Sequence, residues 1–220
     1  MRRLSLIAAA LVGLAAMPAA GQTAAESTAP AGTYHLDPTE THLLYKVSHL
    51  GFSSHIALFT RITGELQFDP AHPEAMTLAA TVDASSLETN YPDPKTDFNA
   101  ILTGPDLLDA KQFPSMTFQS TKVALTGPFS ADVTGDLTLH GVTKPLTLQV
   151  TFNGGYAPND MDPGGARVGF SATGSLMRSD FGMDMGIPEP GTTMGVGDKV
   201  EIIIEAEFLN PDAPKLKTSP

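Results

Sequence analysis

The side chains best suited to binding a metal or moving a proton are the histidines, and the sequence has six: His35, His42, His49, His55, His72 and His140. The first three are spaced seven residues apart, which places successive side chains on opposite faces of a strand. No pair has a zinc-site spacing with a supporting carboxylate or thiolate. We therefore predict structural histidines and no metal site. As an alternative, His49 and His55, which flank a turn at Gly51, donate hydrogen bonds to the head group of a ligand.

The acidic residues do not form a recognisable catalytic or calcium-binding set. The loop 160–164 loosely resembles a calcium loop, but the later acidic ligand is missing, so we predict a plain turn. Glutamates 201, 205 and 207 share one strand face, which indicates a solvated surface rather than acid–base catalysis. The sequence contains no Gly-x-Ser-x-Gly elbow, P-loop or dinucleotide fingerprint. We predict a protein that is not an enzyme and uses no cofactor.

Composition excludes further classes of protein. The 220 residues include no cysteine, which excludes a disulfide framework, a thiol nucleophile and a lipidated N-terminal cysteine. The formal net charge is −11, from 13 basic and 24 acidic side chains. It becomes −13 without the two arginines at positions 2 and 3, which belong to the signal described next. A surface of this charge repels phosphate backbones and anionic membranes, so no nucleic-acid partner is expected.

The N-terminus has the three parts of a secretory signal. The arginines at positions 2 and 3 precede an apolar run, 4–14, and a small-residue stretch, 15–21. The apolar run is much shorter than the roughly 20 residues of a spanning helix. We therefore expect a soluble protein exported to the periplasm, with a signal peptide over 1–21. Cleavage after Gly21 fits this assignment, although Ala25 is also acceptable.

The rest of the chain divides into one domain and two tails. Residues 22–32 and 211–220 have little apolar periodicity, and we predict that both are disordered. Residues 33–210 form the domain, in which apolar and polar residues alternate with the period of two that is typical of strands. The clearest case is 200–208, where Ile203 is the single exception. Inward sides of further strands are Leu43, Tyr45 and Val47; Leu66 and Phe68; Leu78, Ala80 and Val82; Met116 and Phe118; Leu137 and Leu139; Leu146, Leu148, Val150 and Phe152; and Val168, Phe170 and Ala172.

This pattern predicts an all-β domain of about eight strands. Turns are expected at Asp69-Pro70 and at His140-Gly141. A short helical insertion is predicted over 96–109, interrupted by Gly104-Pro105. Periodicity alone allows either a barrel or a sandwich.

Four groups of segments resemble those of YceI-like, polyisoprenoid-binding periplasmic proteins. The first contains 34–37 (YHLD) and 49–53 (HLGFS), and the second contains 64–69 (GELQFD), 102–109 (LTGPDLLD) and 113–118 (FPSMTF). The third, most diagnostic, is 135–146 (GDLTLHGVTKPL), and the fourth is 178–183 (RSDFGM). Together these segments extend over essentially the whole predicted domain.

The resemblance implies a lipocalin-like antiparallel barrel that holds an amphiphile with an isoprenoid tail, such as a quinone or a polyprenyl chain, without metal or chemistry. A barrel of this size is filled by its own side chains or holds one small ligand. The absence of tryptophan and the many small strand residues favour a hollow interior. The residues predicted to form the cavity and its mouth are Leu50, Phe52, Phe59, Leu66, Phe68, Val82, Phe98, Leu102, Leu107, Phe118, Phe152, Phe170, Phe181, Met183, Ile202 and Ile204.

One departure from the family pattern concerns the head group. Family members commonly place basic residues between positions 87 and 107, whereas this chain has only Lys95 there. A diphosphate normally requires Arg or Lys donors, so the deficit favours a neutral head such as a quinone. The candidate head-group contacts are His49, His55, Asn90, Lys95 and Asn99.

Methionines 177, 183, 185 and 194 suit either an adaptable apolar portal or a loop that caps the barrel. The predicted partner is an isoprenoid lipid or quinone, with transient membrane contact, and the sequence does not choose between a monomer and a homodimer. Two other functions remain open at this point. One is a solid barrel whose surface binds another envelope protein, and the other is an enzyme that modifies a lipid.

Overall fold

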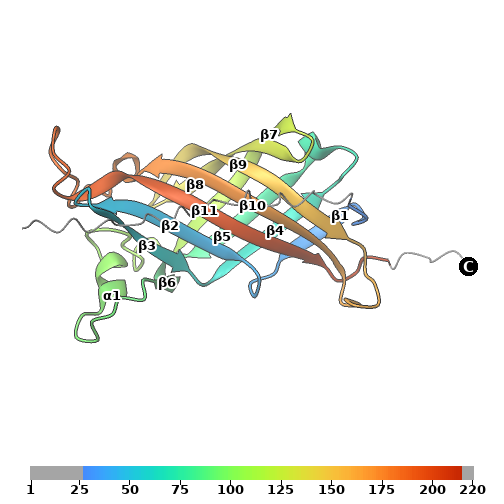
Figure 1. The fold of residues 1–220 in the computed structure, drawn as a ribbon, viewed down its shortest axis with the longest axis horizontal. Helices are drawn as coiled ribbons and strands as arrows, with labels where there is room; N and C mark the ends of the chain where they lie inside the picture. The colour runs from blue at the N-terminus through green and yellow to red at the C-terminus, as the bar shows by residue number, and fades with distance from the viewer. Residues whose placement is uncertain (1–26, 215–220) are drawn as a thin grey trace, which may run out of the picture.

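The computed structural model describes residues 27–214, so the predicted signal peptide lies outside the described part. The described chain is almost entirely β (Figure 1). Its strands are β1 (Gly32–Leu36), β2 (His42–His49), β3 (Ser53–Phe59), β4 (Ile62–Phe68), β5 (Thr77–Asp83), β6 (Leu87–Glu88), β7 (Ser115–Gly127), β8 (Ser130–Leu139), β9 (Val142–Tyr156), β10 (Ala166–Met177) and β11 (Val196–Asn210). The helices are α1 (Phe98–Leu102) and the 3-10 turns η1 (Pro73–Ala75), η2 (Ala84–Ser86) and η3 (Arg178–Phe181).

The strands close into an antiparallel barrel rather than a sandwich. The order β1-β4-β5-β7-β8-β9-β10-β11 returns to its start because β1 also pairs with β11, with His35 opposite Leu209. The three remaining strands, β2, β3 and β6, each adjoin a strand of this ring along the chain and are separated from it by a bend or turn. β2 follows β1 and stays paired with β11, β3 leads into β4, and β6 follows β5 after η2. The closed ring of the barrel therefore contains eight strands, which confirms the predicted fold class and the predicted strand number.

The alternation in the sequence matches the two sides of the barrel wall. On β11, Val200, Ile202 and Ile204 face the interior, whereas Ile203 points outward and is 37% exposed. The turn at His140-Gly141 joins β8 directly to β9, and both residues have positive φ, at 50° and 75°. This conformation belongs to a tight two-residue hairpin turn, as the sequence predicts.

One end of the barrel is closed by an aromatic cluster, which we call the floor. Tyr34 is fully buried and meets Phe68 edge-on at 5.4 Å between ring centroids. Phe152 lies 5.9 Å from Phe68 and 5.3 Å from Phe170, which in turn lies 6.1 Å from Phe208. Such packed rings seal the end by filling space.

The predicted N-terminal tail over 22–32 differs from the structure. Within its described part, Ala29 is buried and the backbone N–H of Thr28 donates to the Gly155 carbonyl at 3.2 Å. The hydroxyl of Tyr34 donates to the Pro30 carbonyl at 2.8 Å. Residues 27–31 thus cover the floor, and β1 already begins at Gly32. The prediction of disorder is therefore wrong for residues 27–32. Apolar periodicity is absent there, but the buried hydroxyl of Tyr34 requires a hydrogen-bond acceptor, and this segment provides one at Pro30.

The helical insertion is shorter than the predicted range 96–109. Asp97 caps α1 by accepting a hydrogen bond from the N–H of Ala100 at 2.9 Å, and the helix ends at Leu102. Gly104-Pro105 prevents its continuation, and turns follow. Within residues 27–214, none of the helices has the length and hydrophobicity that a transmembrane span requires.

A charged clasp fixes the bend between β1 and β2 near the floor. Arg167 of β10 contacts Asp37 at 2.7 Å, Asp162 at 2.6 Å and Glu207 at 3.4 Å. A hydrogen bond from the Thr39 hydroxyl, followed by one from Arg167, lowers the pKa of Asp37 to about 2. The clasp therefore ties the bend to β10, β11 and the loop before β10.

Candidate functional site

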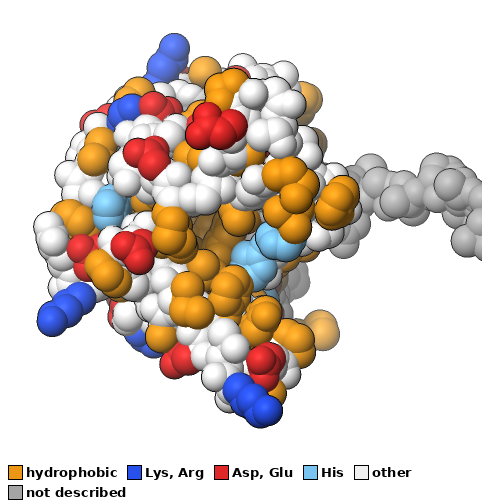
Figure 2. Space-filling view, turned by 90° about the vertical axis from the view of Figure 1, so that its left-hand side faces the viewer, with side chains coloured by type: hydrophobic (Ala, Val, Ile, Leu, Met, Phe, Trp, Pro, Cys, Tyr) orange, Lys and Arg blue, Asp and Glu red, His pale blue; other side chains and the backbone are white. Residues whose placement is uncertain are grey.

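The barrel encloses a cavity of about 820 Å³ that opens at the end opposite the floor. We call this end the mouth; it is formed by the turn 50–52, the segment 89–114 and the loop 182–195. Figure 2 looks into this end and shows a hollow with hydrophobic side chains inside it and histidine side chains at its edge. The volume lies within the range of roughly 300–1,000 Å³ that is typical of small-molecule sites.

Small side chains on the inner wall leave this space open. Ala80, Ala172 and Ala206 line the cavity at positions where the strand alternation turns their methyl groups inward. Around them the wall consists mainly of Leu, Ile, Val and Phe, with Leu146 and Leu148 of β9 as examples. The cavity agrees with the predicted hollow interior, because a barrel of about eight strands either is filled by its own side chains or holds one small ligand.

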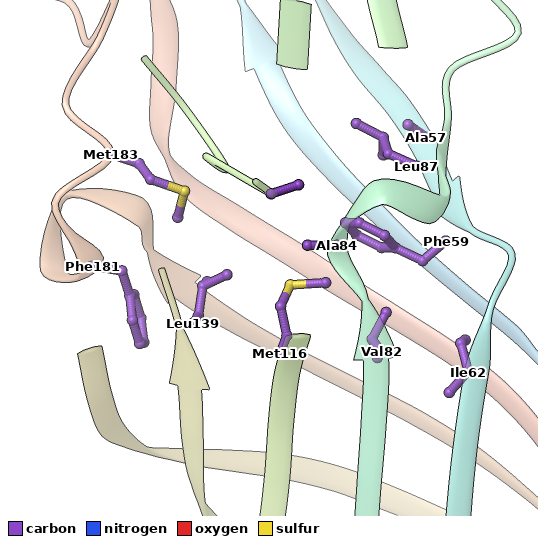
Figure 3. Close-up of a cluster of buried hydrophobic side chains, with 11 residues drawn as sticks. Ala57, Phe59, Ile62, Val82, Ala84, Leu87, Met116, Leu139, Phe181 and Met183 are labelled. Carbon is purple, nitrogen blue, oxygen red and sulfur yellow. The ribbon is translucent and has the colours of Figure 1, made fainter. Parts of the chain in front are cut away.

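A packed cluster supports the wall near the mouth (Figure 3). Phe59 of β3, Val82 of β5, Met116 of β7 and Leu139 of β8 come together with Phe181 of η3 and Met183 of the loop 182–195. The strand residues of the cluster share one side of the barrel, because β5, β7 and β8 are neighbours and β3 leads into β4, the strand next to β5. The loop is therefore held against the barrel by the same apolar burial that stabilises the strands.

Arg178 holds the other half of this loop in place. Its side chain is buried, and its guanidinium donates to the carbonyls of Met183 at 2.6 Å, Val196 at 2.9 Å and Gly197 at 2.9 Å. These bonds join η3 to the loop and to the start of β11. Arg178 lines the cavity and is the only lysine, arginine, aspartate or glutamate among the described lining residues.

Eleven of the sixteen predicted apolar contacts lie on the cavity wall: Phe59, Leu66, Val82, Phe98, Leu102, Leu107, Phe118, Phe170, Met183, Ile202 and Ile204. The five others lie outside it. Phe68 and Phe152 pack in the floor, and Phe181 packs behind the wall in the cluster of Figure 3. Leu50 and Phe52 belong to the β2–β3 turn, where Phe52 is 83% exposed, because a tight turn projects its side chains away from the barrel.

The predicted head-group contacts separate in a similar way. His49 and His55 line the cavity, whereas Asn90, Lys95 and Asn99 do not. The Asn99 side chain is used within the fold: its Oδ1 accepts from the Thr89 hydroxyl at 2.6 Å, and its amide donates to Glu88 at 3.3 Å. Asn90 and Lys95 lie exposed in the segment between β6 and α1. Their positions in the sequence place Asn90, Lys95 and Asn99 near the mouth but do not determine whether their side chains point into the cavity.

Of the methionines, Met183 and Met185 line the cavity, whereas Met177 and Met194 are exposed and do not. The loop thus contributes two methionine side chains to the mouth, the buried Met183 and the half-exposed Met185. Flexible thioethers at this place suit an adaptable apolar opening.

Tyr45 and Tyr91 line the cavity but were not among the predicted contacts. Burial raises the pKa of the Tyr45 phenol to about 12, so this group stays protonated at neutral pH. The signal for Tyr45 was present, since it shares the inward face of its strand with Leu43 and Val47. The signal for Tyr91 was weaker, because it lies in an irregular segment.

The described residues contain no group of three His, Cys, Asp or Glu side chains arranged to hold a metal ion. The loop that loosely resembled a calcium loop is a turn in which Asp162 accepts hydrogen bonds. Its donors are the Tyr156 hydroxyl at 3.0 Å, Arg167 Nε at 2.6 Å and the N–H of Gly164 at 3.2 Å. Its carboxylate is therefore engaged in the fold.

Comparisons with known proteins agree with this architecture. The family model described as YceI-like domain matches residues 34–208. A UPF0312 protein of Pseudomonas putida W619 is 41% identical over 168 residues, covering 75% of this chain and 81% of its own. A UPF0312 protein of Pseudomonas savastanoi pv. phaseolicola is 40% identical with the same coverage.

Among solved structures, BcnA of Burkholderia cenocepacia is 27% identical, with a TM-score of 0.63 over 78% of this chain and 98% of its own. A domain from Saccharophagus degradans, described as polyisoprenoid binding, is 14% identical, with a TM-score of 0.58 over 82% of this chain and 98% of its own. At that identity the likeness shows a shared fold.

Proposed function

The chain belongs to the YceI-like family, and we propose that it is an exported, periplasmic protein that binds one isoprenoid-type lipid with an uncharged head, such as a quinone, inside its barrel. The observation that carries this proposal is the apolar cavity of about 820 Å³, closed at the floor and open at the mouth. The neighbour described as a polyisoprenoid binding domain has the same fold, which supports this choice of ligand.

The size of the cavity suits a short isoprenoid tail. If each non-hydrogen atom occupies about 30 Å³, the share of a water molecule in the liquid, the cavity holds about 27 such atoms. This corresponds to about five isoprene units. Each buried CH₂ is worth roughly 0.8 kcal/mol relative to water, so a tail of this length strongly favours an apolar enclosure. A barrel packed solidly by its own side chains would offer no such enclosure for the tail.

The electrostatics of the mouth favour an uncharged head. Arg178 faces the cavity, but its guanidinium is bonded to three backbone carbonyls. Lys95, the basic residue that the sequence placed nearest the mouth, does not line the cavity. Burial, together with the nearby His49, lowers the pKa of His55, so this imidazole is neutral at pH 7. A diphosphate would therefore meet few of the charge-assisted donors it requires.

A binding role accounts for these features without catalysis. The tail would leave one apolar environment, a membrane, for another, the barrel, which keeps the free-energy difference between the two states small. Transient contact between the mouth and a lipid surface follows from this transfer. The high negative charge favours contact with neutral rather than anionic lipids.

The test is to express the full chain in a bacterial host and purify it from the periplasmic fraction without detergent. Native mass spectrometry should show a one-to-one complex, and organic extraction should release an isoprenoid with a neutral head. A protein that is recovered from the periplasm, folded and free of any apolar compound, and that does not take up added quinone or polyprenol, would refute the lipid-binding function. Recovery only from the cytoplasm would refute export.

A further inference from the structure

Several polar side chains of the cavity wall lie on the β2–β3 hairpin, among them Tyr45 and His55. Because residues of the hairpin alternate between its two faces, Tyr45 of β2 and His55 of β3 both point into the cavity. In the hairpin register Tyr45 lies opposite Ala57, and His55 lies opposite Val47. The two polar residues are thus diagonal neighbours, with ring centroids 6.0 Å apart.

The ring of His55 is held in a fixed position. Phe98 of α1 meets it edge-on at a centroid distance of 5.5 Å, on a different element from Tyr45. Phe98 itself packs against Tyr91 in a tilted arrangement, with the ring centroids 4.7 Å apart. An imidazole packed between aromatic rings of β2 and α1 is preorganised, so little rotamer entropy is lost when it binds a ligand.

The Nε2 atom of His55 is buried and has no hydrogen-bond partner within the described residues. Buried polar atoms of folded proteins are nearly always paired, and an unpaired one calls for an explanation such as a missing partner. Tyr45 provides a second polar group on the same wall, and its hydroxyl makes no hydrogen bond to another described residue. A bound molecule that carries an oxygen atom at this depth would satisfy both groups.

We propose that His55 and Tyr45 form the anchor for the ligand head, and that they select a lipid whose head carries an uncharged hydroxyl or carbonyl oxygen. This proposal rests on the lipid-binding function proposed above and specifies the chemistry that the site recognises. A phenol donates a hydrogen bond, and a neutral imidazole either donates or accepts at Nε2 according to its tautomer. The pair therefore suits a quinone carbonyl or a polyprenol hydroxyl equally well.

The anchor also discriminates against two other ligand classes. A pure hydrocarbon would fill the cavity and leave Nε2 of His55 unpaired, which carries a desolvation penalty. A phosphorylated lipid would bring charge to a cavity whose one lysine or arginine among the described lining residues, Arg178, is already bonded to backbone carbonyls. The selection thus depends on hydrogen bonding rather than on charge.

Competition between chain-matched ligands tests the anchor. The delipidated full chain is mixed with geranylgeraniol and with the hydrocarbon of the same chain length, and native mass spectrometry counts each complex. The wild type should prefer the alcohol by about three- to tenfold, the size of one net hydrogen bond. His55→Phe keeps an aromatic ring against Phe98, so it should weaken the preference for the alcohol while binding of the hydrocarbon is retained.

Two further variants make the result specific. Tyr45→Phe should reduce the same preference, whereas His42→Phe, a substitution on the same hairpin but outside the cavity wall, should leave it unchanged. An unaltered preference in a folded His55→Phe variant, or equal binding of both ligands by the wild type, would overturn the anchor and leave lipid binding intact. Binding of neither ligand by the wild type would overturn both proposals.

Discussion

Replacing Ala172 by phenylalanine should shorten the longest lipid that the barrel accepts by about one isoprene unit. Ala172 is 8% exposed and faces the cavity between Val150 and Ile204 of the flanking strands. The substitution adds about six non-hydrogen atoms, which at about 30 Å³ each remove roughly 180 Å³. An isoprene unit of five carbons needs about 150 Å³ on the same scale. The loss is therefore more than one fifth of the 820 Å³ available.

The assay incubates the protein with an equimolar ladder of prenols of increasing length and determines the bound distribution by native mass spectrometry. Thr173→Phe is the matched control, because Thr173 is the next residue of β10 and its side chain is exposed on the outer face. Added bulk in a filled core typically costs about 1–3 kcal/mol, so the melting temperature of both variants must be measured alongside. If folded Ala172→Phe protein binds the same distribution as the wild type, the lipid does not occupy this cavity.

Three other substitutions test the floor, the clasp and the loop. Phe208→Ala should lower the free energy of unfolding by about 3–5 kcal/mol and shift the bound prenols toward longer chains, because it removes part of the floor; an unchanged length limit would mean that the floor does not set it. Asp37 has a folded pKa of about 2 against an ordinary value of 3.8, so its stabilising contribution is present above pH 3.8 and is lost as pH falls toward 2. Asp37→Asn should therefore cost roughly 2 kcal/mol at pH 7 in urea unfolding, and a difference from the wild type that persists at pH 2 would contradict the clasp. Arg178→Lys cannot reach three carbonyls at once and should lower the unfolding free energy by about 3 kcal/mol. Faster amide exchange across 183–197 should accompany this loss, and wild-type exchange there would contradict the assigned role.

The strands and their inward faces could be predicted because one physical rule governs both. A half-buried strand alternates apolar and polar residues, and the same alternation decides which side chains line the cavity. This is why Leu43, Leu146 and Val150, which were predicted only as inward-facing strand residues, all lie on the cavity wall. The segments that carry the family resemblance then distinguished a barrel from a sandwich, which periodicity alone does not do.

The mouth could not be predicted to the same degree, because irregular segments have no period that fixes their side chains. Asn90 and Lys95 are close to the mouth in sequence, yet neither lines the cavity. Arg178 belongs to a recognised segment, but its three bonds join residues 5 to 19 positions away, which no local pattern reveals. The unpaired Nε2 of His55 is likewise a property of the three-dimensional packing.

The asymmetry of the two ends implies a direction for the bound lipid. The floor is built from packed rings and a buried tyrosine whose hydroxyl is already bonded to Pro30, so it offers no hydrogen bond to a ligand. The unpaired Nε2 of His55 lies instead on the β2–β3 hairpin, whose turn is at the mouth. A lipid inserted head first would leave its oxygen unsatisfied among phenylalanines and His55 unpaired as well, two penalties of about 1–3 kcal/mol each. Tail-first insertion removes both penalties, and it leaves the head at the end from which the lipid enters and leaves.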